Sequence, residues 1–305
     1  MSPSLDSVGR SSTAERRTLP IGVIGLGRLG SALAGALAAV GYHNVTVTGR
    51  DAARVERLAP LLGVTAQPID TLVERSALVF LTVPDHAIEG LGDTLRWHAG
   101  QGVVHCSGAL GLDVLRGVEA GGAHAGCLHP LQTFPAASSG TALTMRACAD
   151  LFEGIVCGVE GAAPVGDLLM AIADDLGARI VRLEGVDRAL YHAAAVLVSN
   201  DVIALMAAAS RAWERAGLDV TAAQTALAPL LLAASSNAAH LPLAAALTGP
   251  IARGDAVTVE RHLRALDADP GLRALYRALG RELLRLDLGL SPEARAALEA
   301  LLHEG

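Results

Sequence analysis

A few polar residues interrupt apolar stretches of this sequence, and their types could do acid–base chemistry. His192, Ser199 and Asn200 follow one another at steps of seven and eight residues in an Ala- and Val-rich segment. That spacing brings them close to one face of a helix. An imidazole can protonate a developing alkoxide or amine, while a hydroxyl and an amide can orient the reacting group. The competing interpretation is a core histidine whose polar neighbours satisfy its hydrogen bonds.

A second group of such residues lies upstream, between positions 124 and 134. His124, Cys127 and His129 are ligand types for zinc, and Gln132 and Phe134 follow them. Residues 127 and 129 share a face of a strand, but no fourth ligand is evident. We therefore predict no metal, and we expect His129, Gln132 and Phe134 to line a substrate cleft opposite His192.

A third group surrounds a predicted tight turn near position 250. Thr248 precedes Gly-Pro, and Arg253 is separated from Asp255 by one glycine. Arg253 could hold a substrate carboxylate through two parallel hydrogen bonds. Alternatively, Arg253 pairs with Asp255 and only fixes the turn.

Lysine is absent, so all 24 basic residues are arginines. The missing amine excludes a Schiff-base lysine, a phosphate-loop lysine and a lysine general acid. Proton donation must therefore come from another group, and the ten histidines are the first candidates.

A glycine-rich loop predicts a dinucleotide site. The strand expected at 21–24 runs directly into Gly-x-Gly-x-x-Gly, and an Ala-rich helix is expected at 31–39. The first glycine allows a tight turn, the second lets the backbone approach a pyrophosphate, and the third lets the helix pack on the strand. The residues expected to bind the cofactor here are Gly25, Leu26, Gly27, Arg28, Leu29 and Gly30.

The end of the next expected strand indicates which dinucleotide is bound. Thr48-Gly49 is followed by Arg50, where an NAD site usually carries Asp or Glu. A guanidinium suits a 2′-phosphate, so we predict NADP. The alternative is that Arg50 is solvated and Asp51 caps the next helix, and Arg28 is either a phosphate contact or a surface residue.

Further cofactor contacts are expected where later strands end. Thr82, Val83 and Pro84 close the strand predicted at 78–83, and Ser107 follows the strand predicted at 102–105. Ligands of doubly wound sheets lie at this carboxyl edge.

The chain divides by pattern into three parts. We predict a disordered tail at 1–18, an α/β dinucleotide-binding domain at 19–184 and a helical domain for substrate and dimer contacts at 185–305. The second domain should begin with a long helix at about 187–216. The predicted strands, read as a parallel sheet, are 21–24, 45–48, 78–83, 102–105, 125–128, 155–159 and 179–183.

Composition bounds the partners and the compartment. A net charge of −7 argues against a nucleic-acid partner. Four cysteines without a Cys-x-x-Cys pair favour a reducing cytoplasm. The polar start lacks the apolar run of a signal peptide, and His192, Asn200 and Asp201 interrupt the apolar stretch 191–210, so no membrane span is predicted.

The joint occurrence of these motifs resembles a known family. The motifs are the glycine loop, Leu-Thr-Val-Pro-Asp at 81–85, His-Pro-Leu-Gln-Thr-Phe at 129–134, Tyr-His to Ser-Asn at 191–200, and the segment 247–255. Over roughly 19–266 the chain resembles the Rossmann-like proteins that carry the domain of unknown function 2520. That family stands beside 6-phosphogluconate dehydrogenase, ketopantoate reductase and pyrroline-5-carboxylate reductase. The resemblance implies a Rossmann domain, a helical C-terminal domain of the 6-phosphogluconate dehydrogenase kind, NADP and homodimers.

The resemblance also shows where this chain departs from its wider superfamily. Hydroxyacid dehydrogenases and ketopantoate reductases use a lysine on the long helix as proton donor, and His192 is the candidate here. We expect an NADPH-dependent reductase of a small carbonyl or imine substrate, first of all a ketopantoate-like 2-oxo acid. The alternative is a noncatalytic NADP-binding regulator or partner protein.

Overall fold

The computed structural model describes residues 3–5, 12–134 and 144–303. The chain forms two compact units, Met1–Val196 and Leu197–Gly305. This boundary comes later than the predicted one at 184/185, because the first turns of the long helix pack on the N-terminal unit through Arg188 and Tyr191.

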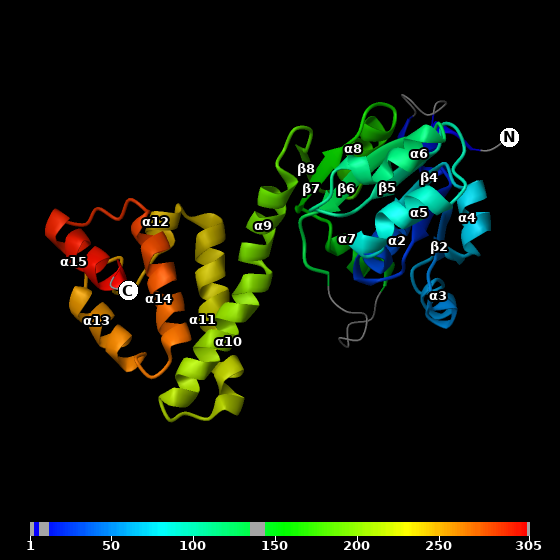
Figure 1. Ribbon diagram of the computed structural model, residues 1–305. Helices are drawn as coiled ribbons and strands as arrows, with labels where there is room; N and C mark the ends of the chain where they lie inside the picture. The colour runs from blue at the N-terminus through cyan, green and yellow to red at the C-terminus, as the bar shows by residue number, and fades with distance from the viewer. Residues whose placement is uncertain (1–2, 6–11, 135–143, 304–305) are drawn as a thin grey trace. The chain divides into compact units, whose positions relative to one another are not determined.

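The N-terminal unit is built on one eight-stranded sheet (Figure 1). Its strand order is β3-β2-β1-β4-β5-β6-β7-β8, so the direction of winding reverses between β1 and β4. That reversal is where doubly wound folds bind ligands. The strands are β1 (Ile21–Ile24), β2 (Val45–Thr48), β3 (Thr65–Ala66), β4 (Leu78–Leu81), β5 (Gly102–His105), β6 (His124–Pro130), β7 (Val156–Glu160) and β8 (Arg179–Arg182).

Two features of the sheet differ from the predicted all-parallel arrangement. Strand β7 runs antiparallel to β6, with His129 opposite Gly158, and β8 is parallel to β7. Strand β3 was not predicted, because a pair of residues carries no periodic signal. At the sheet edge, β8 is exposed along its length, which explains the arginines at both of its ends.

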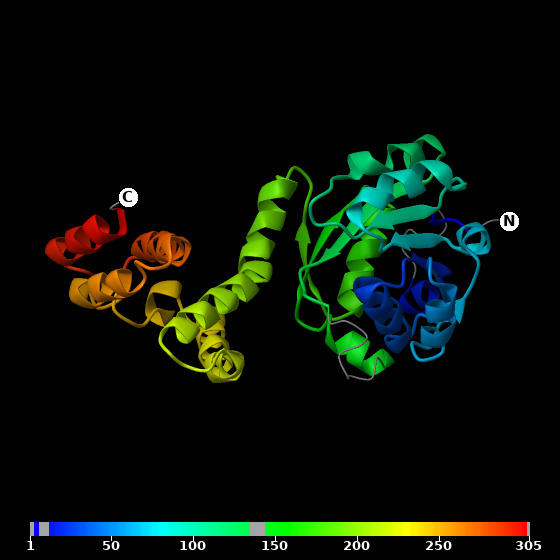
Figure 2. The same cartoon turned by 60° about the horizontal axis from the view of Figure 1, so that its bottom comes forward.

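Helices cover both faces of the sheet (Figure 2). Alternate strand residues face one of two apolar clusters, as the twofold period of a strand requires. Helices α2 (Arg28–Ala39), α3 (Ala52–Leu58), α7 (Met145–Asp150) and α8 (Val165–Asp175) pack into the larger cluster. Helices α4 (Ile69–Arg75), α5 (Ile88–Thr94) and α6 (Arg116–Ala120) cover the other, and short 3-10 turns lie at Asp85–Ala87 and Leu112–Leu115.

The predicted disordered tail at 1–18 is ordered in its described part. Leu5 is fully buried, and its amide donates to the carbonyl of Gly100. Helix α1 (Thr13–Arg17) begins with a capping box between Ser12 and Glu15. Both features were missed, because a lone apolar residue in a polar segment has no period.

The second unit is helical, as predicted, and has its own core around Ile251, Val259 and Leu298. The predicted long helix is divided at Ser199, which has φ −120° and ψ −75°. Its first part, α9, belongs mostly to the N-terminal unit. The helices are α9 (Arg188–Val198), α10 (Asn200–Arg215), α11 (Val220–His240), α12 (Leu243–Ala246), α13 (Ala256–Ala265), α14 (Pro270–Leu284) and α15 (Pro292–His303).

The helical stretch 188–215 is apolar and exposed. Its most apolar window has a mean hydropathy of 1.7, and 6% of that window is buried. By length and composition alone it passes as a membrane span, despite the polar residues that argued against one. A single such helix is weak support for a span, and an apolar face left exposed also fits a protein partner.

Candidate active site

The glycine loop joins β1 to α2 at the point where the sheet reverses its winding. Gly25 has φ +105°, a conformation that favours glycine. A side chain on Gly30 would overlap the carbonyl of Gly25 and collide with the hydroxyl of Thr82. The third glycine therefore permits close packing of helix on strand, as the motif predicts.

Gly27 differs from these two glycines because no neighbour in the described part of the chain requires it. It is exposed, has φ −75°, and a Cβ there would have no atom within 4 Å. It is also the N-cap of α2, without a side-chain cap. The open backbone before the first turn of a 12-residue helix fits the pyrophosphate of a dinucleotide.

The segment after β2 carries two arginines beside the glycine loop. Arg50 is exposed, and Asp51 caps α3 by accepting from the amide of Arg54 at 2.9 Å. The Nε of Arg54 donates to the carbonyl of Leu26 at 3.3 Å. Arg54 therefore contacts the loop, and it was missed because only the fold turns its side chain back onto Leu26.

Two of the predicted rim residues after β4 and β5 make hydrogen bonds to neighbouring loops. Thr82 donates to the carbonyl of Gly25 at 2.7 Å and so helps to fix the glycine loop. Ser107 donates to Asp85 at 2.7 Å and accepts from the amides of Ala109 and Leu110. The hydroxyl of Ser107 thus shapes the turn after β5, while Val83 is half-buried and Pro84 is exposed.

Three aromatic side chains meet above that turn. Nδ1 of His129 lies 2.9 Å from the hydroxyl of Tyr191, and the rings of His129 and His192 are 6.2 Å apart. A Cβ on Gly108 would lie 2.7 Å from Nε2 of His129 and 2.9 Å from Nδ1 of His192. The glycine after Ser107 therefore lets both imidazoles reach the carboxyl edge of the sheet.

Burial sets the protonation of this group. It lowers the pKa of His129 to about 4, with help from the neighbouring His192 and Arg188. It also raises the pKa of Tyr191 to about 12. At pH 7 the His129 ring is thus neutral and Tyr191 keeps its proton.

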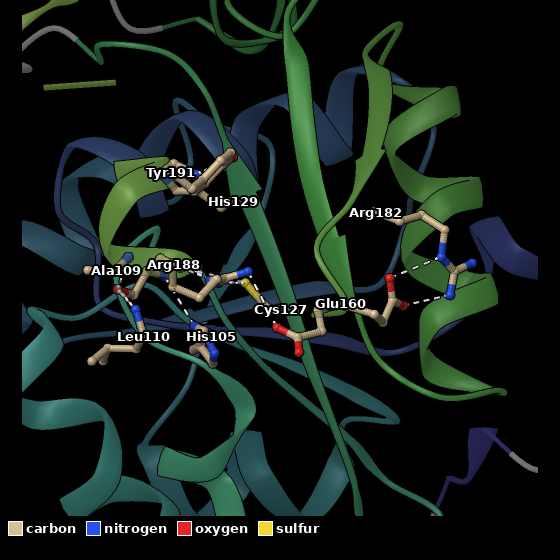
Figure 3. A network of polar contacts seen from close by, with 11 residues as sticks. His105, Ala109, Leu110, Cys127, His129, Glu160, Arg182, Arg188 and Tyr191 are labelled. Atoms are coloured by element: carbon tan, nitrogen blue, oxygen red, sulfur yellow. Dashed lines mark hydrogen bonds and ion pairs between the residues drawn. The ribbon is translucent and has the colours of Figure 1, made fainter. Parts of the chain in front are cut away.

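Arg188, at the start of α9, connects this helix to strands β6 and β7 and to the turn after β5 (Figure 3). Its guanidinium donates to the carbonyl of Ser107 and to the sulfur of Cys127, each at 3.0 Å, and pairs with Glu160 at 3.4 Å. The side chain is 10% exposed. Burial raises the pKa of the Cys127 thiol to about 11 despite this arginine, so Cys127 is neutral and not a nucleophile.

Replacing Arg188 with methionine should lower the free energy of unfolding by about 3 kcal/mol at neutral pH, because it leaves Glu160 without its cation. Burial already raises the pKa of Glu160, and Arg188 opposes that rise. Without the arginine, the folded protein binds a proton at Glu160 more tightly than the unfolded chain. The variant should therefore be least destabilised at pH values below the glutamate pKa of the unfolded chain. Its free energy of unfolding should fall as the pH rises from that pKa through the raised pKa of Glu160 in the folded variant.

Urea unfolding at several pH values measures this effect. Arg182→Met is the matched control, because Arg182 pairs with Glu184 at 2.6 Å with both side chains largely exposed, and stability should barely change. Adding Glu160→Gln to the Arg188 variant should restore part of the loss and flatten its pH dependence. Equal losses for Arg188→Met and Arg182→Met would contradict the role of the buried pair.

Two predicted cleft residues lie apart from the histidines. Phe134 packs on Phe152, with ring centres 5.4 Å apart, at the edge of the larger apolar cluster. Gln132 is exposed, and its side-chain oxygen Oε1 accepts from the backbone amide of Thr133. The structure therefore gives Phe134 a packing role and joins neither residue to His129.

Four other predicted site residues belong to the second unit. Ser199 donates to the side chain of Asn200 at the break between α9 and α10. Because the helix is interrupted there, the face that they were expected to share with His192 stays a prediction. Thr248 and Arg253 are exposed. Asp255 caps α13 through Thr258, and among the described residues no ion pair joins it to Arg253. The turn is fixed by this cap instead of the alternative Arg253–Asp255 pairing.

With the geometry established, two family descriptions match the chain. Residues 5–130 match a Rossmann-like domain. Residues 155–283 match the domain of unknown function DUF2520. The chain thus has a region similar to a Rossmann-like domain, followed by a region similar to DUF2520. The predicted resemblance is confirmed, and the DUF2520 match includes Arg188, Tyr191 and His192.

Solved structures share this fold. A Bacteroides fragilis protein, provisionally named an NADP oxidoreductase, is 26% identical, with 88% of this chain and 98% of that one covered and a TM-score of 0.68. Protein TM1727 of Thermotoga maritima is 24% identical, with 92% of this chain and 98% of that one covered and a TM-score of 0.65. 1-Pyrroline-5-carboxylate reductase of Streptococcus pyogenes is 17% identical, with 88% of this chain and 100% of that one covered and a TM-score of 0.58. No curated protein matches the chain.

Proposed function

We propose that this chain is an NADP(H)-dependent oxidoreductase that reduces a small carbonyl or imine compound. The observation that carries the proposal is Gly27, an exposed residue at the start of α2 where a side chain would meet no neighbour among residues 3–5, 12–134 and 144–303. A backbone kept bare in this place fits a bound pyrophosphate. The name of the Bacteroides fragilis relative supports the same class.

NADP is the proposed form because of the arginines after β2. Arg54 donates to the glycine loop at Leu26, and the exposed Arg50 would lie near the adenosine ribose because it directly follows the end of β2. Their charge favours a 2′-phosphate. Arg28, the exposed first residue of α2, would add a contact to the phosphates.

The reacting end of the site would lie at the turn after β5. The chemistry that NADPH supplies when bound is a hydride. His192 would give the proton, and His129 would contact the substrate oxygen. Ser199 and Asn200 would orient the substrate and Arg253 would hold its carboxylate, so the first substrate to test is a ketopantoate-like 2-oxo acid, followed by pyrroline-5-carboxylate.

Titration of the purified protein with NADPH and NADH tests the cofactor. We expect NADPH to bind at least about 10-fold more tightly, since a phosphate–guanidinium interaction is lost with NADH. Arg50→Ala should narrow this preference, and Arg57→Ala, on the last turn of α3, is a control that should not. Failure to bind either dinucleotide would refute the proposed function, and a preference for NADH would refute the role of Arg50.

The second candidate is a noncatalytic NADP-binding regulator. It rests on the same bare backbone at Gly27, which would bind a dinucleotide whether or not a reaction follows. Tight NADPH binding, with no NADPH oxidation by any of a broad panel of 2-oxo acids and cyclic imines, would support it. Turnover with one of them would exclude it.

We also propose a homodimer in the cytoplasm. Apolar side chains on α9 and α10 are left exposed, including Leu190 at 71%, Val198 at 76% and Ile203 at 70%. A second copy would cover them. The four cysteines are buried and unpaired, as in a reducing compartment. Sedimentation equilibrium tests the dimer, and a monomer at micromolar concentration would contradict it.

A further inference from the structure

The hydroxyl of Tyr191 is held in one place by two neighbours. It lies 2.9 Å from Nδ1 of His129, and the two rings meet edge to face at 75° with centres 5.5 Å apart. A Cβ on Gly158, which pairs with His129 across the sheet, would lie 2.7 Å from this hydroxyl. Among the described residues, Nδ1 is its only hydrogen-bond partner.

The direction of this hydrogen bond follows from what each group must do with its proton. The pKa of Tyr191 is raised to about 12 by burial, so the hydroxyl stays protonated. If Nδ1 of His129 carried a proton, the phenolic proton would have no acceptor in the described protein. A buried donor without a partner costs about 1–3 kcal/mol. The hydroxyl therefore donates, Nδ1 accepts, and the proton of the neutral His129 ring resides on Nε2.

Nε2 of His129 faces the turn after β5. It approaches the bare Cα of Gly108, beside Nδ1 of His192. In a doubly wound sheet this carboxyl edge is where a ligand lies. The fixed tautomer therefore presents an N–H donor at that edge (Figure 3 shows Tyr191 beside His129).

We propose that Tyr191 is a positioning residue that holds His129 as the neutral Nε2–H tautomer, and that this N–H donates to the carbonyl oxygen of the substrate. A neutral donor stabilises negative charge that grows on an oxygen. It gives no such support to a protonated imine, whose nitrogen has no free lone pair. The site then prefers carbonyl compounds over iminium ions. This substrate class rests on the proposed function, whereas the tautomer does not.

The tautomer is measurable by nitrogen NMR of the full-length protein labelled at histidine. His129→Gln identifies the His129 signals. In the wild type we expect a bare, pyridine-type Nδ1 and a protonated Nε2. Tyr191→Phe keeps the ring and its packing but removes the donor, so the His129 signals should shift toward a mixture of tautomers.

The chain contains a matched control in its second unit. His262 and Tyr276 repeat the arrangement, with Nδ1 2.9 Å from the hydroxyl and ring centres 5.8 Å apart. Tyr276→Phe should change the His262 signals and leave those of His129 unchanged. A protonated Nδ1 on His129 in the wild type, or His129 signals unaffected by Tyr191→Phe, would overturn the positioning role.

Kinetics test the substrate class separately. With an active 2-oxo acid, Tyr191→Phe should lower kcat by about 10-fold with little change in KM, because the donor acts on charge that develops in the transition state. The wild type should reduce that acid faster than a cyclic iminium compound of similar size. Faster iminium reduction would overturn the substrate class. A Tyr191-dependent tautomer in a protein that binds no NADPH would refute the proposed function and still support the positioning role.

Discussion

Gly27→Ala should weaken NADPH binding by about 100-fold or more while changing the free energy of unfolding by less than about 1 kcal/mol. A Cβ at this position meets no atom of the described chain within 4 Å, and the backbone, at φ −75°, accepts alanine. The methyl group would instead occupy the space over the N-terminus of α2, where the pyrophosphate must approach the amides. Isothermal titration with NADPH and urea unfolding measure the two quantities.

Two other glycines separate binding from folding. Gly90 lies in α5, also with no atom near its Cβ position, so Gly90→Ala should alter neither NADPH affinity nor, beyond a small gain, stability. Gly30→Ala should unfold the loop, because its Cβ would overlap the carbonyl of Gly25. Wild-type affinity in Gly27→Ala would show that the pyrophosphate is not bound here.

The sequence predicted the dinucleotide half of the molecule well because its signals are local. The strand at 21–24, the three glycines and the start of α2 are adjacent in the chain, and each has a distinct physical requirement. The order of the first strands then follows from the general rules for doubly wound sheets. The antiparallel β7 was missed because a buried strand reads the same in either direction.

The group of side chains around His129 and His192 was predicted less well, because the residues in contact there are distant in sequence. His129 and His192 were expected to face one another, and the structure places both over Gly108. Arg188 contacts Ser107, 81 residues away, and no spacing in the sequence encodes that contact. Tyr191 was visible only as part of a motif, since its partner at His129 comes from the fold. Phe134 also packs on Phe152 at the edge of the core, a contact that the motif did not predict, and its place in the cleft stays a prediction.

His192→Asn should lower kcat by about 100-fold or more on any carbonyl substrate found for this chain, because it removes the proposed proton donor. Nδ1 of His192 is buried beside Gly108, which leaves Nε2 to reach the substrate. His129 is a poor alternative donor, since its pKa of about 4 is held down partly by His192 itself. Of the two adjacent imidazoles, His192 is the proposed acid, because burial disfavours the protonated form of His129. NADPH affinity should be unchanged.

Chemical rescue distinguishes proton donation from a packing role. His192→Ala leaves space for a free imidazole, which should restore part of the lost turnover in proportion to its protonated fraction. Imidazole should not accelerate the wild type or the control His43→Asn, whose side chain is exposed near α2. Unchanged turnover in His192→Asn would remove His192 as the acid. A loss that imidazole cannot restore, together with lower stability, would assign His192 to packing.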